Sequence, residues 1–146
     1  MLKIGDDAQS ALAVSDDVVR KFAEATGDNN PLHLDEDFAR KTRFGKRIAH
    51  GMIAASHISA VLGNILPGPG TVYLSQDLQF VAPVFVGDVI TARVKVITIK
   101  EGKPIATLET VCENQKGEVV LKGHAVVLFS AGSDGSAAQT GSAACK

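Results

Sequence analysis

The sequence predicts an α+β domain in which an antiparallel sheet packs against one long buried helix. Residues 51–66 read GMIAASHISAVLGNIL, which is apolar on nearly every face of a helix and stops before Pro67. EGK at 101–103 and QKG at 115–117 predict hairpin turns between strands. Segments rich in Val, Ile and Thr predict the strands themselves: 71–82, 88–100, 104–115 and 118–130. An antiparallel sheet needs one face covered, and the apolar helix can cover it.

Shorter signals predict the elements before the long helix. A strand is expected around residues 8–14. Ser15 is followed by two Asp residues and an apolar pattern that ends at Gly27, which predicts a helix capped at both ends. A second, short helix is expected over residues 35–41.

Length and composition exclude several classes of protein. The 146 residues are 45% hydrophobic and 21% charged, so one domain can bury a core without a disulfide or a metal. Fifteen basic and sixteen acidic residues give a net charge of −1, which provides no global positive field for nucleic acid or an anionic membrane. Cys112 and Cys145 form no CxxC pair, which argues against redox chemistry and structural zinc. The expected partner is a small molecule or another protein chain.

The chain is expected to be cytoplasmic, because it has no secretory pattern and no apolar run long enough to span a membrane. The last sixteen residues, 131–146, include eleven Ala, Gly or Ser and no large apolar side chain. Such a segment cannot offset its ordering entropy. Residues 1–130 are therefore expected to form the domain, followed by a flexible tail or a truncated linker.

Polar residues concentrate in the segment GDNNPLHLD, residues 27–35. Asp28 and His33 would not face each other on a continuous helix, but Pro31 favours a turn that brings both side chains to one point. A carboxylate beside a histidine can share the two proton transfers of adding or removing water. The alternative is an ordinary turn, in which Asp28 and Asn30 bond the local backbone and His33 is half exposed.

A second polar feature opens the apolar helix at His50 and Gly51. A helix N-terminus carries unpaired N–H groups and a positive dipole end, so it can stabilise a carbonyl oxygen that gains negative charge. The alternatives are that Gly51 allows close packing against a strand and that His50 is a polar cap. A run of basic residues precedes this point and forms either a solvated loop or a site for coenzyme A phosphates: Arg40, Lys41, Arg43, Lys46 and Arg47.

Three segments, in this order, resemble the MaoC-type (R)-specific enoyl-CoA hydratases: GDNNPLHLDEDFA, RIAHGMIAAS and YLSQDLQFVAPVFVGD. The resemblance extends to about residue 130. It implies the hot-dog fold, a curved antiparallel sheet wrapped around a long central helix, and a homodimer with substrate tunnels near the subunit interface. The family's catalytic acid and histidine match Asp28 and His33, its backbone oxyanion donor matches Gly51, and its helix serine near the dyad matches Ser56.

The resemblance therefore implies a hydro-lyase that adds water reversibly to a trans-2-enoyl-CoA and forms (R)-3-hydroxyacyl-CoA. Asp28 and His33 are expected to hold one water and exchange protons with it, which requires neither a cofactor nor a metal. The remaining candidate residues orient the dyad or the substrate (Asn30, Ser56 and His50) or contact coenzyme A phosphates (Arg43, Lys46 and Arg47).

Two other functions stay open. A hot-dog thioesterase would direct water at the carbonyl carbon and release free coenzyme A, but many such enzymes resemble this chain less because they use a lone carboxylate on the helix. A non-catalytic acyl-CoA binding domain of a longer protein is the third possibility, and the presence of both dyad residues argues against it.

His57 and His124 have no carboxylate pair at metal spacing, so they are expected to pack or to lie at an interface.

Overall fold

The computed structural model describes residues 1–130 and 140–141. In chain order the elements are β1 (Asp7–Ala13), α1 (Asp16–Thr26), α2 (Pro31–Leu34), α3 (Glu36–Arg40), α4 (Gly51–Asn64), β2 (Val72–Gln76), β3 (Gln79–Phe80), β4 (Val89–Ile99), β5 (Ile105–Glu113), β6 (Val119–Leu128) and β7 (Thr140–Gly141). The tail expected at residues 131–146 lies outside the described residues, apart from the two residues of β7.

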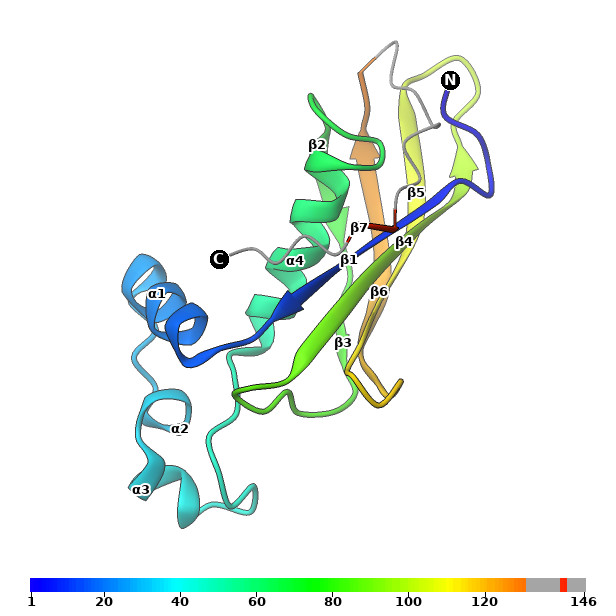
Figure 1. Cartoon of the computed structure of the whole chain (residues 1–146). Coiled ribbons are helices and arrows are strands. Elements are labelled where there is room, and N and C mark those ends of the chain that lie inside the picture. The colour runs from blue at the N-terminus through cyan, green and yellow to red at the C-terminus, as the bar shows by residue number, and fades with distance from the viewer. Residues whose placement is uncertain (131–139, 142–146) are drawn as a thin grey trace.

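All strands belong to one curved sheet with the order β2-β6-β5-β4-β1-β7, and β3 also pairs with β6. Neighbours are antiparallel except β1 and β7, which are parallel. Helix α4 lies along one face of the sheet and packs against β4, β1 and β5 (Figure 1). The predicted α+β architecture, with a long helix covered by an antiparallel sheet, is confirmed.

The core lies between α4 and the inner face of the sheet. Side chains alternate along β4, so Ile90 and Val94 are fully buried while their neighbours face outward. Ile58 and Leu62 of α4 pack in the same core, and each buried side chain of this size contributes about 1.5–3 kcal/mol. This packing fixes the position of α4. Within the described residues, no helix is long and apolar enough to cross a membrane.

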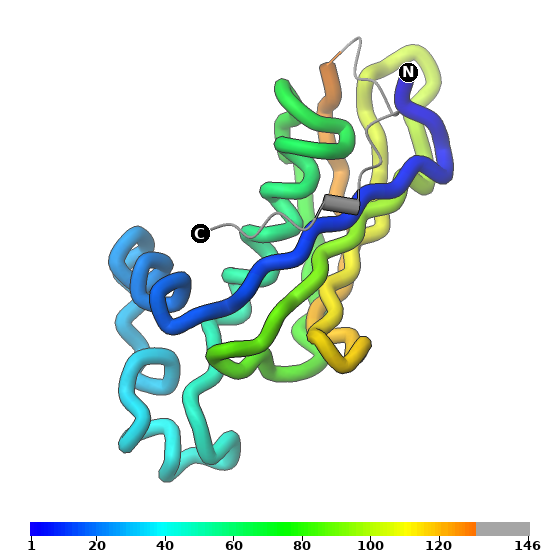
Figure 2. Tube along the Cα trace, viewed as in Figure 1, coloured from blue at the N-terminus to red at the C-terminus, as the bar shows by residue number. Residues whose placement is uncertain are grey.

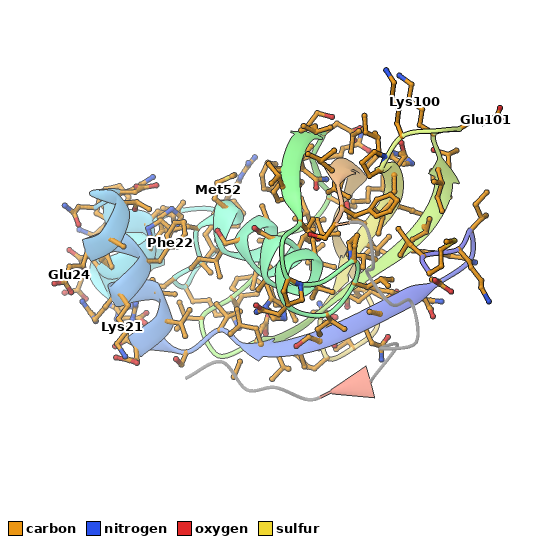
Figure 3. The ribbon with its side chains drawn as sticks, turned by 90° about the horizontal axis from the view of Figure 1, so that it is seen from above. Lys21, Phe22, Glu24, Met52, Lys100 and Glu101 are labelled. Carbon is orange, nitrogen blue, oxygen red and sulfur yellow. The ribbon has the colours of Figure 1, made fainter. Side chains whose placement is uncertain are left out.

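Helices α1, α2 and α3 lie together beyond one end of β1, beside the start of α4 (Figure 2). The Ser15 side chain accepts a hydrogen bond from the Val18 N–H, and Gly27 ends α1 with a φ of 77°, so both predicted caps are confirmed. Phe22 lies between α1 and the beginning of α4 (Figure 3). These contacts anchor α1 beside the start of the central helix.

Most predicted boundaries differ from the observed ones by one or two residues, and two segments differ in kind. Helix α4 ends at Asn64 instead of residue 66. The strand predicted over residues 71–82 is two strands, β2 and β3, separated by Asp77 and Leu78. Asp77 lies so close to β6 that a Cβ atom at Gly123 would collide with its carbonyl oxygen. The turn predicted at Pro31 is the one-turn helix α2, since proline fits the first helical position.

Candidate active site

The segment between α1 and α3 presents His33 toward the interior. The Asn30 side chain caps α2 by accepting a hydrogen bond from the Leu32 N–H, and Pro31 begins the helix. The Asn30 N–H also donates to the Asp28 carboxylate at 3.3 Å, and the Asn30 carbonyl accepts from the His33 N–H at 3.0 Å. Asn30 therefore contacts both members of the predicted dyad through its backbone, while its side-chain oxygen serves as the cap.

The His33 ring is buried, with 8% of the residue exposed, and its orientation is fixed by one hydrogen bond. Nδ1 lies 2.7 Å from the carbonyl oxygen of Ile48. A carbonyl can only accept, so Nδ1 carries the hydrogen and the neutral ring keeps its lone pair on Nε2. Burial lowers the pKa of His33 below its usual 6.5, and the nearby His50 and Arg47 act in the same direction. The ring is therefore neutral at pH 7 and can accept a proton.

His50 joins Asp28 and His33 to the start of α4. Its Nε2–H donates to the Asp28 carbonyl oxygen at 3.0 Å, and its ring contacts the rings of His33 and Phe22, with centroids 4.0 and 5.0 Å away. The residue is 3% exposed, and its Nδ1 has no hydrogen-bond partner among the described residues. It precedes α4 without making a side-chain cap hydrogen bond. His50 thus occupies the N-cap position, as the polar-cap alternative has it, but its side chain does not cap the helix.

Asp28, His33 and His50 form a cluster whose spacing can be compared with two kinds of occupant. One carboxylate oxygen and one nitrogen from each ring all lie within 4.8 Å of one another. Zinc bonds of about 2.1 Å place two ligands at most about 4.2 Å apart. A water with hydrogen bonds of about 2.8 Å can join atoms up to about 5.6 Å apart. A limit of 4.8 Å is therefore compatible with one water that bridges the cluster, and it includes the separations that zinc ligands would have.

The N-terminus of α4 meets His33 at a cavity of about 380 Å³, named here the His33 cavity. Among the described residues, none accepts a hydrogen bond from the Gly51 N–H. The Phe80 ring of β3 lies so close to Gly51 that an added Cβ atom would be 2.7 Å from its Cε1 atom. The close packing considered for Gly51 is thus present, and Gly51, whose N–H is unpaired, lines the cavity. The cavity is lined by His33, Arg43, Phe44, Ile48, Ala49, Gly51, Ala54, Phe80, Val81, Ala82, Pro83, Val84, Val120 and Leu121.

Ser56 occupies a different part of the chain surface. Its Oγ–H donates to the Met52 carbonyl oxygen at 2.7 Å, within α4. It lines a second cavity, of about 350 Å³, together with Phe22 and His57. Phe22 also contacts His50, so this apolar cavity lies next to the cluster. The structure gives Ser56 no contact with Asp28 or His33.

The three basic residues considered for phosphate contact have different surroundings. Arg43 is exposed and lines the His33 cavity. Lys46 is also exposed, with its Nζ 4.3 Å from the Phe85 ring centroid. Arg47 is only 7% exposed, and its guanidinium binds Asp16 at 2.6 Å. The assignment of Arg47 to phosphate contact is therefore wrong, because its charge is buried and already paired.

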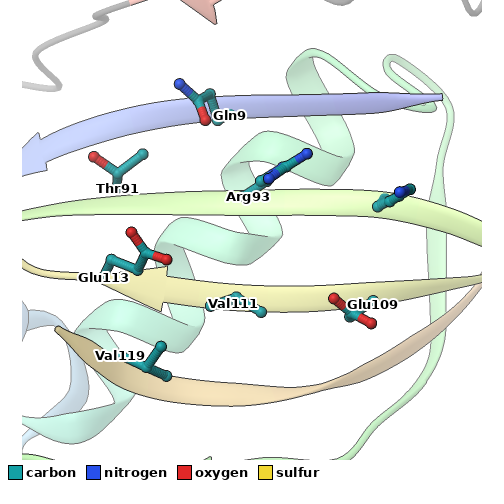
Figure 4. A pocket seen from close by; sticks show the side chains of 8 residues that line it. Gln9, Thr91, Arg93, Glu109, Val111, Glu113 and Val119 are labelled. Carbon is teal, nitrogen blue, oxygen red and sulfur yellow. The ribbon is translucent and has the colours of Figure 1, made fainter. Parts of the chain in front are cut away.

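A further cavity, of about 410 Å³, lies on the sheet face opposite α4 (Figure 4). Its side chains belong to the outward-facing rows of β1, β4, β5 and β6, where Lys95 lies opposite Glu109 and Arg93 is paired with Asp7 at 2.7 Å. Such cross-strand charges are ordinary for a solvated sheet face. Because the sheet separates this cavity from α4, it does not belong to the cluster around His33.

Sequence reasoning missed two aromatic residues beside the cluster. Phe80 covers Gly51, and Phe22 contacts the His50 ring. The helical apolar pattern includes Phe22, but no local signal indicates which residue it meets. Phe80 lies in an apolar segment whose division into β2 and β3 the sequence does not reveal.

Comparisons with known proteins give consistent results. The family model described as "MaoC like domain" matches residues 4–117. An (R)-specific enoyl-CoA hydratase from Rhodospirillum rubrum is 45% identical over 130 residues, covering 89% of this chain and 90% of that protein. One from Aeromonas caviae is 47% identical, covering 86% and 94%. A solved structure described as an (R)-hydratase from A. caviae involved in PHA biosynthesis superposes with a TM-score of 0.86 at 46% identity, covering 88% of this chain and 98% of that one.

Proposed function

The chain belongs to the MaoC-like domain family, and on that premise we propose that it is an (R)-specific enoyl-CoA hydratase, a hydro-lyase acting on a trans-2-enoyl-CoA. One observation carries the proposal: Asp28 and His33 lie together, and His33 lines the same cavity as Gly51, whose N–H has no acceptor among the described residues. A base, a carboxylate and an oxyanion donor are the groups that hydration of an enoyl thioester needs.

In the proposed mechanism, Asp28 and His33 hold one water between them. His33 has a neutral Nε2 lone pair, so the dyad removes a proton from the water as its oxygen attacks C3 of the substrate. The electrons of the double bond move toward the thioester, whose oxygen gains enolate charge and is stabilised by the Gly51 N–H. The dyad then returns a proton to C2, which completes a syn addition and restores its starting state.

The coenzyme A moiety is proposed to approach from the side of Arg43 and Lys46. Arg43 lines the His33 cavity, and both side chains are exposed, so their charges are available to phosphates. Asn30 and His50 are proposed to orient the dyad, through the backbone contacts described above. Ser56 remains a candidate for contact with the substrate from the neighbouring apolar cavity.

The decisive experiment follows the loss of enoyl absorbance with crotonyl-CoA and longer trans-2-enoyl-CoAs, with chiral analysis of the product. A thiol reagent in a parallel reaction detects free coenzyme A. We expect (R)-3-hydroxyacyl-CoA and no thiol release. Thiol release without hydration would instead identify a thioesterase, and binding without any conversion would identify a non-catalytic acyl-CoA binding domain.

The dyad is tested with Asp28→Asn and His33→Gln, each expected to lower turnover by at least ~10². Asp37→Asn and His124→Gln are matched controls, because both residues are exposed and lie outside the cluster. Normal turnover in either folded dyad variant would refute the assignment of catalysis to Asp28 and His33.

The protein is further proposed to be a homodimer formed through the β2 edge of the sheet. β2 pairs only with β6 among the described residues, and Val72 and Leu74 are about half exposed along it. Phe80 and Val81 extend this exposed apolar surface to the His33 cavity. Covering such a surface with a second copy removes both an open edge and apolar area from water. A light-scattering mass of one chain at micromolar concentration would contradict the proposed homodimer.

Two other expectations also remain proposals: that residues 1–130 form one domain, and that the protein is cytoplasmic.

A further inference from the structure

Arg47 is a buried cation that the proposed mechanism does not use, and its contacts surround His33. Its Nε–H donates to the His33 carbonyl oxygen at 2.7 Å. Its Nη2 lies 2.6 Å from an Asp16 carboxylate oxygen, and its Nη1 lies 3.7 Å from a Glu36 carboxylate oxygen. One side chain thus connects the beginning of α1, the end of α2 and the beginning of α3.

Arg47 and the adjacent Ile48 both form hydrogen bonds with His33. Arg47 binds the His33 backbone carbonyl, while the Ile48 carbonyl accepts the hydrogen bond from His33 Nδ1. The first bond fixes the place of His33 and the second fixes its ring orientation and tautomer. Segment 47–48 leads directly into His50 and Gly51, so its position relative to His33 also determines the distance from the base to the oxyanion donor.

From these contacts we infer that Arg47 is a positioning residue for the proposed hydration reaction, holding His33 in register with the start of α4. This inference rests on the proposed function. Arg47 touches neither the reacting atoms nor the cavity, and its effect is transmitted through His33. Displacing a reacting group by about 1 Å can reduce the rate of a reaction 10²-fold, so one anchoring bond is sufficient to matter.

The charge of Arg47 provides a second readout. The charged and titratable groups around the His33 ring are Asp28, His50 and Arg47, and Arg47 is in turn paired with Asp16 and Glu36. Arg47 and His50 both disfavour protonation of His33, whereas Asp28 favours it. Removing the guanidinium charge should therefore shift the acidic limb of the kcat/KM profile to higher pH. A purely structural role of Arg47 would not produce this shift in the folded enzyme.

The test compares Arg47→Met and Arg47→Lys in the full chain, with crotonyl-CoA as substrate. Lysine keeps the charge but lacks the Nε–H, so it separates anchoring from electrostatics. Both variants should lose about 10- to 100-fold in kcat with little change in KM. Only Arg47→Met should shift the acidic limb of the kcat/KM profile to higher pH. Arg93→Met is the matched control, because Arg93 is also paired with a carboxylate but lies on the outer sheet face; it should behave as the wild type.

Wild-type kcat in folded Arg47→Lys would overturn the inference, as would an unshifted profile in Arg47→Met. If Arg47→Met does not fold, kcat and KM of Asp16→Asn test the inference instead, because this substitution removes the exposed carboxylate that orients Arg47. A lowered kcat at constant KM would support the inference, and wild-type kcat would overturn it. Failure of the proposed function is distinguished separately, since in that case the wild-type enzyme itself would not hydrate crotonyl-CoA.

Discussion

Replacing Gly51 by alanine tests the proposed oxyanion donor with a single methyl group. The new Cβ atom would lie 2.7 Å from Cε1 and 2.9 Å from Cδ1 of Phe80. Carbon atoms pack ordinarily at about 3.5 Å or more, so the ring must move by about 0.8 Å. Phe80 is 55% exposed, which gives its ring room to move. The methyl group would then occupy the space between the ring and the backbone at the cavity.

The expected effect on stability is small because two contributions oppose each other. Alanine is favoured over glycine in a helix by up to about 1 kcal/mol. Displacing a packed ring costs about 1–3 kcal/mol, with the lower end appropriate to a half-exposed side chain. We therefore expect Tm to change by no more than about 4 °C. The variant should be folded when its activity is measured.

The expected effect on activity is large. If the thioester oxygen approaches the Gly51 N–H, the methyl group obstructs it, and kcat/KM for crotonyl-CoA should fall about 10²- to 10³-fold, as when one oxyanion donor is removed. Gly63→Ala is the matched control on the same helix, because no atom lies within 4 Å of its added Cβ. Phe80→Ala shows whether ring displacement alone lowers activity. A folded Gly51→Ala enzyme with kcat/KM within about threefold of the wild type would refute the role assigned to this backbone N–H.

Three further predictions follow from the buried titratable groups. Because burial lowers the pKa of His33 below 6.5, kcat/KM should stay level at pH 7 and fall only below about 6.5; a decline beginning above pH 7 would contradict this. Burial likewise lowers the pKa of His57, so the unfolded chain takes up protons first as the pH falls below 6.5. The free energy of unfolding in urea should decrease there, and His57→Gln should reduce that dependence. Burial raises the pKa of the Cys112 thiol to about 12, so a Cys145→Ala variant should react with a thiol reagent only when unfolded.

The fold was predictable because its main signals are local. The continuous apolar character of residues 51–66 identifies α4, and the turns at 101–103 and 115–117 delimit the hairpins. Gly102 and Gly117 do adopt positive φ values of 71° and 77° at these turns. Helix α2 was not predicted, because a helix of four residues that begins with a proline is too short to show helical periodicity. Where β2 ends, Asp77 contacts β6, and no local sequence pattern contains such long-range contacts.

The candidate site was predictable only in part, for the same reason. Pro31 indicates that the chain turns between Asp28 and His33, and the structure brings these residues into one cluster. Arg47 was misassigned because it stands in a basic run that includes exposed Arg43 and Lys46. Its burial depends on Asp16, which is 31 residues away in the sequence. The composition of the basic run therefore does not indicate that Arg47 pairs with a carboxylate so far away in the sequence.

The site is assembled by side chains that cross between two segments and bind backbone carbonyls. His33 donates to Ile48, Arg47 donates to His33, and His50 donates to Asp28. All three bonds join residues 28–33 to residues 47–50, so each maintains the same register between the proposed dyad and the start of α4. Residues that maintain one geometry lose their effects non-additively. The kcat losses of Arg47→Lys and His50→Asn should therefore combine to less than their product in the double variant, measured with crotonyl-CoA. Fully multiplicative losses would show that the two side chains support the dyad independently.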